Sequence, residues 1–257
     1  TILANSLWLN EDVAFVPEIM AMLAENYYAS SYRGEMGSPG LNRALQNWMN
    51  TQTGGLLEEQ AGQLALDAET VLALASTLFY QAKWDTEFMQ GKTEDGVFHS
   101  PAGDTTAAFM HSSSTGTYYW GERFGAVGRA IEEGGTMWLL LPDEGVRVES
   151  LLEDPQAMGF LLADGEWENS KRLIVNLALP KFDVTSECDL LGGLAALGVR
   201  DILNPEQADF TPMAEDAEGI YLSAAQHSVR VAIDEEGVTA AAYTVMAAVG
   251  AGEPPEE

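Results

Sequence analysis

The segment Gly237–Gly252 constrains the fold most strongly, because it is a long uncharged stretch in a very acidic chain. The chain has 257 residues, with 40 Asp and Glu against 12 Lys and Arg, and a formal net charge of −28. Acidic residues crowd both ends of the segment, at Asp234, Glu235, Glu236, Glu253, Glu256 and Glu257. Any fold of this chain must therefore explain why charge is kept out of this one segment.

Local propensities within the segment conflict. Its alanines favour a helix, its Val and Thr residues and Tyr243 favour a strand, and its glycines suit a flexible tail. As a strand, it would carry Val238, Ala240, Ala242, Thr244, Met246 and Ala248 on one face, and Thr239, Ala241, Tyr243, Val245 and Ala247 on the other. Either face could enter a sheet without burying a charge.

The rest of the chain predicts a mixed α+β fold with a large sheet content. Apolar spacing predicts helices from Pro17 onward, over 41–49 and, briefly, after Cys188. Strands are expected at 1–10, 71–84, 105–111, 117–120, 173–182 and 220–234, with a hairpin formed by 128–132 and 136–142. The run 71–84 is apolar enough for a strand covered on both faces. We find no repeat and no linker that would divide the chain into two domains.

Composition and motifs exclude several classes of function. The strong negative charge disfavours nucleic acid and anionic membranes as partners. The single Cys188 excludes an internal disulfide framework, and none of His99, His111 and His227 has the spacing of a metal site. The chain also lacks the G-x-S-x-G elbow and the G-x-x-x-x-G-K-[ST] phosphate loop. We therefore expect no metal, no cofactor and no enzymatic activity, and the cellular compartment stays open.

Several motifs in order along the chain resemble the serpin family of serine protease inhibitors. DEEGVTAAA is similar to the hinge and reactive-centre loop of a serpin, NSLWLN and ASTLFYQAKW to two of its central strands, and FMH, LLLPDE, LPKF and LGVRDILNPEQADF to later motifs. The likeness is to an inhibitory serpin of the prokaryotic type. It implies the serpin fold, with a large mixed central β-sheet, further sheets and surrounding helices. The first third of that fold and its last strands are absent, so 1–257 would be a partial single domain with the hinge and loop at 235–257.

The resemblance implies a suicide substrate for a serine protease. Family-style counting places the scissile bond between Ala251 and Gly252, and cleavage near Glu256 or Glu257 is the alternative that stays open. After cleavage the freed loop would insert into the central sheet as a new strand. The residues implied for the hinge are Glu235, Glu236, Gly237, Val238, Ala240, Ala241 and Ala242. Those preceding the scissile bond are Ala248, Val249 and Gly250, and their small size favours an elastase-like protease or another with a preference for small residues. A monomer is implied, with the remaining serpin segments as further partners if the chain is a fragment.

Four residues are implied to support loop insertion. Lys181 would pair with Glu235, and Trp84 would pack nearby. His227 lies where the sheet opens, and Ser76 replaces the Asn usually expected opposite it. Two further residues depart from the family. It usually has Thr or Ser at the position of Val238, and Tyr at the position of Cys188. The residues alone leave other interpretations open: Lys181 could be a surface lysine and His227 an ordinary core histidine.

Two other functions compete with inhibition. Within the family, the chain could be a non-inhibitory chaperone or ligand carrier, whose loop never inserts; the uncharged alanine run argues against this. Outside the family, an acidic hydrolase could use paired carboxylates, although no motif singles out two of the 40 acidic residues. The state of the loop stays open, since a cut loop should lie in the sheet and an intact one should be exposed.

Overall fold

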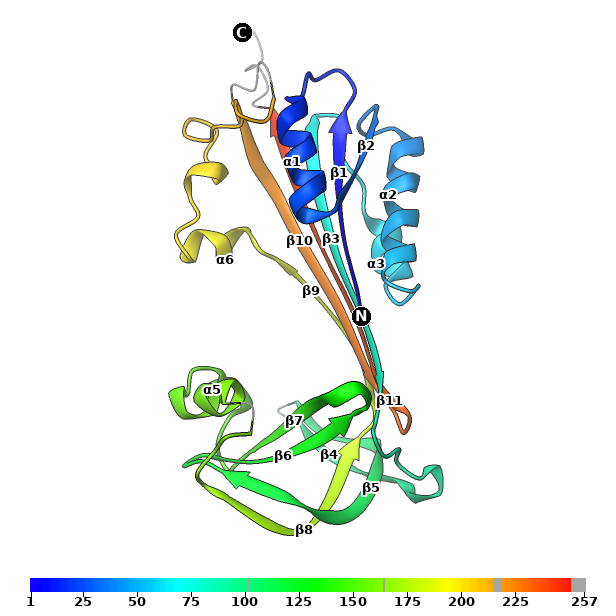
Figure 1. Cartoon of the computed structure of the whole chain (residues 1–257), viewed down its shortest axis with the longest axis vertical. Coiled ribbons are helices and arrows are strands. Elements are labelled where there is room, and N and C mark those ends of the chain that lie inside the picture. Colours follow the sequence, from blue (N-terminus) through cyan, green and yellow to red (C-terminus); the bar gives the residue numbers. More distant parts are fainter. Residues whose placement is uncertain (101, 164, 215–218, 251–257) are drawn as a thin grey trace. The chain divides into compact units, whose positions relative to one another are not determined.

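The structure, a computed structural model, describes residues 1–100, 102–163, 165–214 and 219–250. The chain forms two compact units, which are described separately (Figure 1). The first comprises 1–80, 183–231 and the chain from 239 onward, and the second comprises 81–182 and 232–238. No helix in the described ranges is long and apolar enough to cross a membrane.

A six-stranded sheet makes up most of the first unit. Its strand order is β2 (Ala29–Gly34), β1 (Ile2–Asn10), β3 (Thr70–Lys83), β11 (Gly237–Gly250), β10 (Ile220–Ile233) and β9 (Phe182–Asp189). The strand β1 pairs parallel to β2 and antiparallel to β3, with Asn5 opposite Ser76. A strand from the far end of the sequence, β11, thus lies inside the sheet.

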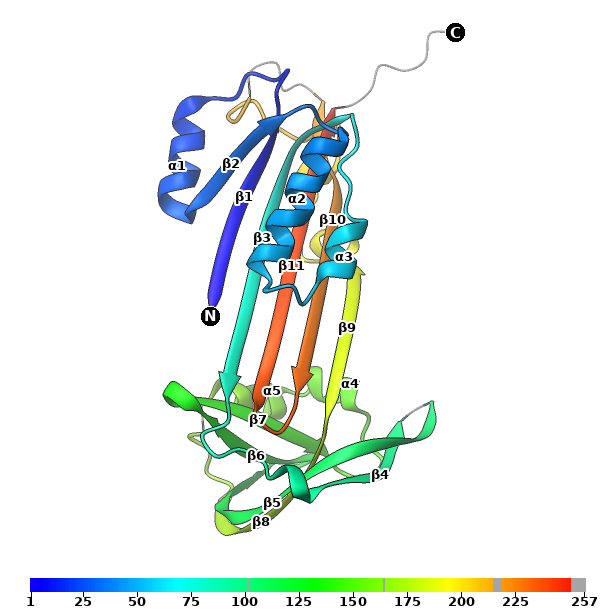
Figure 2. The ribbon, with the colours of Figure 1, turned by 90° about the vertical axis from the view of Figure 1, so that its right-hand side faces the viewer.

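Two helices, α2 (Pro39–Gln52) and α3 (Glu58–Gln63), cover one face of this sheet (Figure 2). Ser38 begins α2, because its side chain accepts a hydrogen bond from the backbone N–H of Leu41, and proline occupies the first turn. Leu45 and Met49 point from α2 into a core that also contains Trp8 from β1. The remaining helices of this unit are α1 (Pro17–Tyr27), α6 (Leu191–Ala196) and the short 3₁₀ turn η3 (Asp201–Leu203).

The second unit contains a smaller sheet. Its strands are β4 (Thr93–Ser100), β5 (Gly103–Trp120), β6 (Phe124–Ile131) and β7 (Gly135–Pro142), in that order, with β8 (Ser170–Pro180) paired to β5. Its helices are α4 (Val148–Leu152) and α5 (Pro155–Leu162), with 3₁₀ turns η1 (Gln90–Lys92) and η2 (Glu132–Gly134). Phe160 of α5 is fully buried and packs against an aromatic cluster formed by Tyr119, Phe124, Trp138 and Trp167.

The α+β class is confirmed, and the expected strands and helices are present with three differences. The two strands expected at 105–111 and 117–120 are one strand, β5, because it pairs with β8 without a break from Phe109 to Tyr119. The expected single strand over 173–182 is wrong, because β8 ends at Pro180, which has no backbone N–H, and β9 begins at Phe182. Between them the N–H of Lys181 donates to the carbonyl of Ala108. Burial of β3 on both faces is also wrong within the described residues, since Leu74 and Leu78 are 41% and 37% exposed.

Candidate functional site

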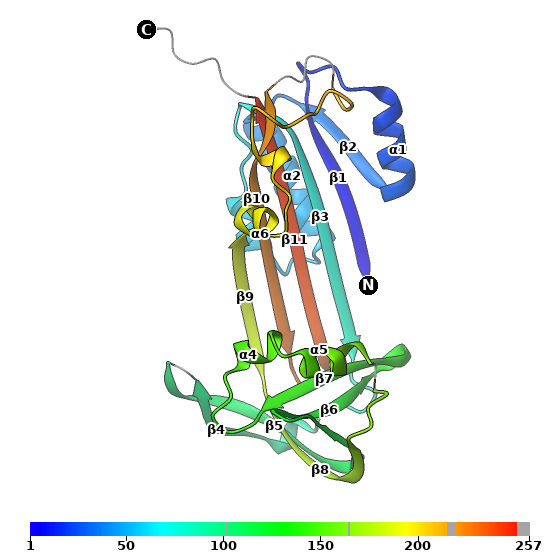
Figure 3. The same cartoon turned by 90° about the vertical axis from the view of Figure 1, so that its left-hand side faces the viewer.

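The candidate site centres on β11, which lies between β3 and β10 (Figure 3). The turn Asp234–Glu236 joins β10 to β11, and the N–H of Asp234 donates to the carbonyl of Gly237, as in an antiparallel hairpin. The conflicting propensities of this segment are therefore resolved in favour of a strand, because β11 finds hydrogen-bonding neighbours on both sides.

One face of β11 is deeply buried beneath α2 and α3. Ala241 and Tyr243 are each 1% exposed, and Val245 and Ala247 are also buried, in the same core as Leu45 of α2. An unpaired charge at these positions would lose its hydration without gaining a partner, at a cost of several kcal/mol. The absence of charge from this segment is thus what its place in the sheet requires.

The other face of β11 contacts one of the expected support residues. The Nδ1 atom of His227 on β10 lies 2.9 Å from the hydroxyl of Thr244 on β11. Ser76 on β3 instead donates its hydroxyl to the side-chain oxygen of Asn5 at 2.7 Å. Because β11 separates β3 from β10, His227 and Ser76 each have another partner, and their expected role in opening the sheet stays a prediction.

The hinge turn docks onto the segment that follows β3, and all of these contacts lie within the second unit. The indole Nε1–H of Trp84 donates to the carbonyl of Asp234 at 2.9 Å. The backbone N–H groups of Phe88 and Trp84 donate to the carbonyls of Glu235 and Glu236, each at 2.9 Å. Three successive hinge carbonyls are therefore held by the segment Trp84–Phe88. Trp84 is 1% exposed, so the indole bond is shielded from water.

The carboxylate of Glu235 is held from two sides. Lys181 Nζ lies 2.6 Å from Oε2, and the hydroxyl of Thr93 donates to Oε1 at 2.7 Å. The hydrogen bonds from Lys181 and Thr93 lower the pKa of Glu235 to about 2. The structure thus brings Lys181, Glu235 and Trp84 together as the sequence led us to expect. Their role in loop insertion stays a prediction.

The lowered pKa of Glu235 predicts a pH-dependent stability. The ionised form is favoured on folding, so its contribution is fully present above the ordinary pKa of 4.5 and is lost as the pH falls from there towards about 2. At about 1.4 kcal/mol per pH unit, the contribution is up to about 3 kcal/mol, reduced because Lys181 is partly solvated. Urea unfolding of Glu235→Gln should show lower stability at pH 7 and a shallower loss between pH 4.5 and 2.

The exposed Glu166 offers the matched control for that measurement. Glu166→Gln makes the same chemical change in the second unit without touching the hinge, so its pH profile should follow that of the unchanged protein. Parallel profiles for all three proteins would contradict the assignment of the acid-sensitive step to Glu235.

The remaining expected site residues fall into two groups. Ala248, Val249 and Gly250 form the last residues of β11, and Ala248 is 1% exposed. The expected scissile pair, Ala251 and Gly252, lies outside the described residues. Sequence reasoning missed Thr93 and Phe88, which contact the hinge from segments that carry no recognised motif. Among the described residues no group of three or more His, Cys, Asp or Glu side chains could hold a metal ion.

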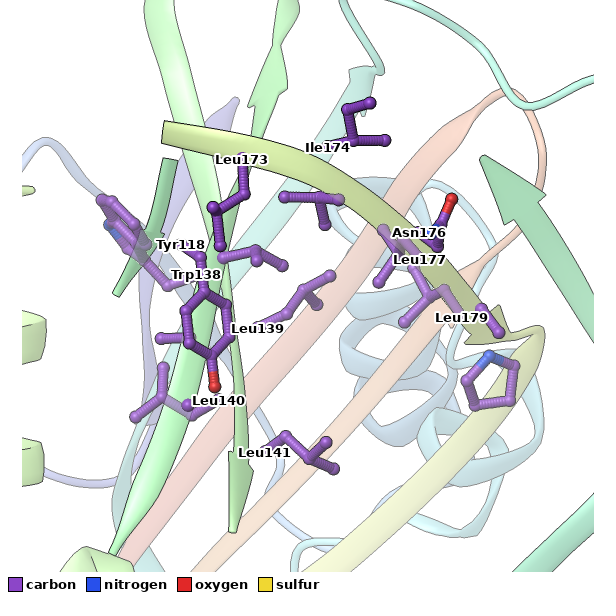
Figure 4. A pocket seen from close by; sticks show the side chains of 16 residues that line it. Tyr118, Trp138, Leu139, Leu140, Leu141, Leu173, Ile174, Asn176, Leu177 and Leu179 are labelled. Atoms are coloured by element: carbon purple, nitrogen blue, oxygen red, sulfur yellow. The ribbon is translucent and has the colours of Figure 1, made fainter. Parts of the chain in front are cut away.

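A concave apolar site, separate from the hinge, lies in the second unit (Figure 4). It has a volume of about 600 Å³ and is lined by apolar side chains of β6, β7 and β8. Leu141 and Ile174 at this site are 75% and 72% exposed. Tyr118 and Asn176 supply the polar side chains of the lining. The arrangement suits an apolar molecule or chain segment and offers no group of acids or bases for catalysis.

Comparison with known proteins shows which family the chain resembles over its whole length. A family profile described as "Serpin (serine protease inhibitor)" matches residues 1–257. The chain is 30% identical to leukocyte elastase inhibitor of Sus scrofa, over 99% of this chain and 69% of that protein. It resembles the solved structure of emu ovalbumin, with a TM-score of 0.87, 20% identity and coverage of 99% of this chain and 67% of the other. Thyroxine-binding globulin in complex with a thyroxine derivative is also similar, with a TM-score of 0.85, 20% identity and coverage of 96% and 72%. The chain thus spans about two thirds of the length of such relatives.

Proposed function

Because the chain belongs to the serpin family, we propose that it inhibits a serine protease by acting as a suicide substrate. The observation that carries the proposal is β11, a neutral segment beside an acidic hinge that is buried as a strand inside the sheet. A reactive-centre loop must be accessible to the protease before cleavage and must fit into a sheet after cleavage. The composition and burial of β11 support the second requirement directly.

The proposed reaction begins with ordinary peptide hydrolysis. The protease serine attacks the carbonyl of Ala251, the bond to Gly252 breaks, the new amine leaves, and an acyl-enzyme remains on Ala251. The freed loop then becomes β11. A strand of 14 residues spans about 46 Å at about 3.3 Å per residue, so insertion would carry the acylated end far from where it began. Serpin loop insertion is an established example of strand addition, and we apply it to this chain.

The free energy for this movement would come from the contacts that β11 makes only after insertion. Its backbone gains hydrogen-bonding neighbours on both edges, and Tyr243 and Val245 enter the core beneath α2. A valine side chain contributes about 1.5–3 kcal/mol when it is fully buried. The docked hinge, held by Trp84 and Phe88, would fix where insertion starts.

The residues before the proposed scissile bond favour a protease with a small primary pocket. Ala248, Val249, Gly250 and Ala251 offer only small aliphatic side chains, which do not suit a pocket built around an acid for Arg or Lys. The likeness to a leukocyte elastase inhibitor points to the same class of target.

Incubation with an elastase-like serine protease tests the proposal. We expect a complex that survives boiling in denaturant and whose mass equals that of the protease plus the chain cleaved after Ala251. A trypsin-like protease serves as the control and should give much less complex. If the elastase-like protease cuts the loop completely and stays fully active, the inhibitory function is wrong.

The concave apolar site lined by β6, β7 and β8 supports one alternative function, that of a ligand carrier. The site is lined by apolar side chains, and its volume of about 600 Å³ is typical of small-molecule sites. One of the similar solved structures is thyroxine-binding globulin with a thyroxine derivative bound. If the chain is a carrier, titration with an apolar hormone-sized ligand should quench the fluorescence of Trp138, which lines the site. Saturable micromolar binding together with no protease complex would favour the carrier over the inhibitor.

A further inference from the structure

Arg129 on β6 lies against the segment that holds the hinge. Its guanidinium carbon is 4.2 Å from the ring centroid of Phe88 and 5.9 Å from the ring of Trp84. Its Nη2 donates a hydrogen bond to the carbonyl of Thr86. These residues all belong to the second unit. A single side chain therefore contacts the beginning, middle and end of the segment Trp84–Phe88.

Apart from the hinge, this segment also contacts β6 and packs its two aromatic rings together. The N–H of Asp85 donates to the carbonyl of Ala130, and Trp84 forms an isolated bridge with Ile131. The rings of Trp84 and Phe88 meet edge to face at 5.9 Å. All of these contacts lead either to β6, the strand that carries Arg129, or to the rings that Arg129 covers.

The chemistry of arginine suits this position. A planar guanidinium can stack on an aromatic ring while its N–H groups donate sideways in the same plane, which a lysine ammonium cannot do. Burial lowers the pKa of Arg129, and the nearby carboxylate of Asp85 opposes that effect. An arginine side chain stays protonated in proteins, so a cation lies close to the carboxylate of Asp85 in this segment.

We propose that Arg129 is a positioning residue that holds Trp84–Phe88 in the conformation that receives the hinge carbonyls. The consequence for the rate of loop insertion rests on the proposed inhibitory function. The structural part does not, because the hinge is already docked in this structure. Arg129 touches neither the protease nor the scissile bond and acts only through the segment it supports.

Hydrogen exchange read by mass spectrometry tests the structural part. In Arg129→Met, peptides covering 82–90 and 232–238 should exchange at least about tenfold faster, while peptides of β5 and β8 keep their rates. Arg129→Lys keeps the charge but not the planar stack, so it should show an intermediate increase. Arg172→Met, at an exposed arginine of β8, is the matched control and should leave both peptides unchanged.

Two outcomes would overturn the proposal: unchanged exchange at the hinge in both Arg129 variants, or an increase spread evenly over the whole chain. If Arg129→Met does not fold, the same criteria apply to Arg129→Lys. With an elastase-like protease, Arg129→Met should also consume several-fold more inhibitor per protease trapped. Failure of the unchanged protein to trap any protease would refute the proposed function, while the exchange result would still decide the role of Arg129.

Discussion

Gly237→Ala is expected to convert the proposed inhibitor into a substrate, with less than about one tenth of the protease encounters ending in a complex. A Cβ atom at this position would lie 2.1 Å from the carbonyl oxygen of Ala82 and 2.9 Å from the Cα of Lys83. Both are backbone atoms of β3, so a small rotation of a side chain cannot relieve the clash. The hinge would have to undock, and with it the bonds that Trp84 makes to Glu236 and Asp234.

Helix α5 supplies the matched control for this substitution, away from both the hinge and the proposed scissile bond. A Cβ atom at Gly159 would meet no heavy atom within 4 Å, so Gly159→Ala makes the same chemical change in open space. The fraction of protease trapped as a denaturant-resistant complex is the measurement, together with the thermal midpoint of the cleaved form. Equal trapping and equal midpoints in the two variants would show that close approach at Gly237 is not needed for insertion.

The sequence predicted the presence of a special segment better than it predicted the segment's conformation. Charge exclusion between Gly237 and Gly252 could be read directly. The choice among helix, strand and tail could not, because alanine-rich propensity is weak and tertiary neighbours decide it. In the structure the decision comes from β3 and β10, which supply hydrogen bonds, and from α2, which covers Tyr243.

The hinge contacts show where prediction from sequence reached its limit. The pairing of Lys181 with Glu235 was expected only because short motifs around both residues resemble a known family. Thr93 lies 142 residues from Glu235 along the chain and donates to the same carboxylate, yet no periodicity or spacing marks it. The donor groups of Phe88 and Trp84 to Glu235 and Glu236 are backbone N–H groups, which almost every residue has. Such contacts depend on which loops the fold brings together, and local sequence patterns do not indicate this.

Val238→Arg should have a comparably large effect, for an electrostatic rather than a steric reason. Val238 is the second residue of β11 and is 7% exposed, so its side chain enters the sheet directly after the hinge. An arginine there would have to lose most of its hydration without a partner, which costs several kcal/mol. Since each 1.4 kcal/mol added to a barrier slows a step about tenfold, a cost of about 3 kcal/mol would slow the first stage of insertion by about two orders of magnitude.

That delay decides the outcome, because insertion competes with hydrolysis of the acyl-enzyme. If hydrolysis is unchanged, a hundredfold slower insertion lets nearly every acyl-enzyme deacylate, and the loop is cut without trapping the protease. Val238→Thr keeps the β-branched shape without charge, so it should trap protease as well as the unchanged protein does. The number of inhibitor molecules consumed per protease trapped separates the cases: a rise of tenfold or more in Val238→Arg alone is expected. The same low number in both variants would mean that charge at this position does not oppose insertion, and the physical explanation offered for the neutral segment would then be wrong.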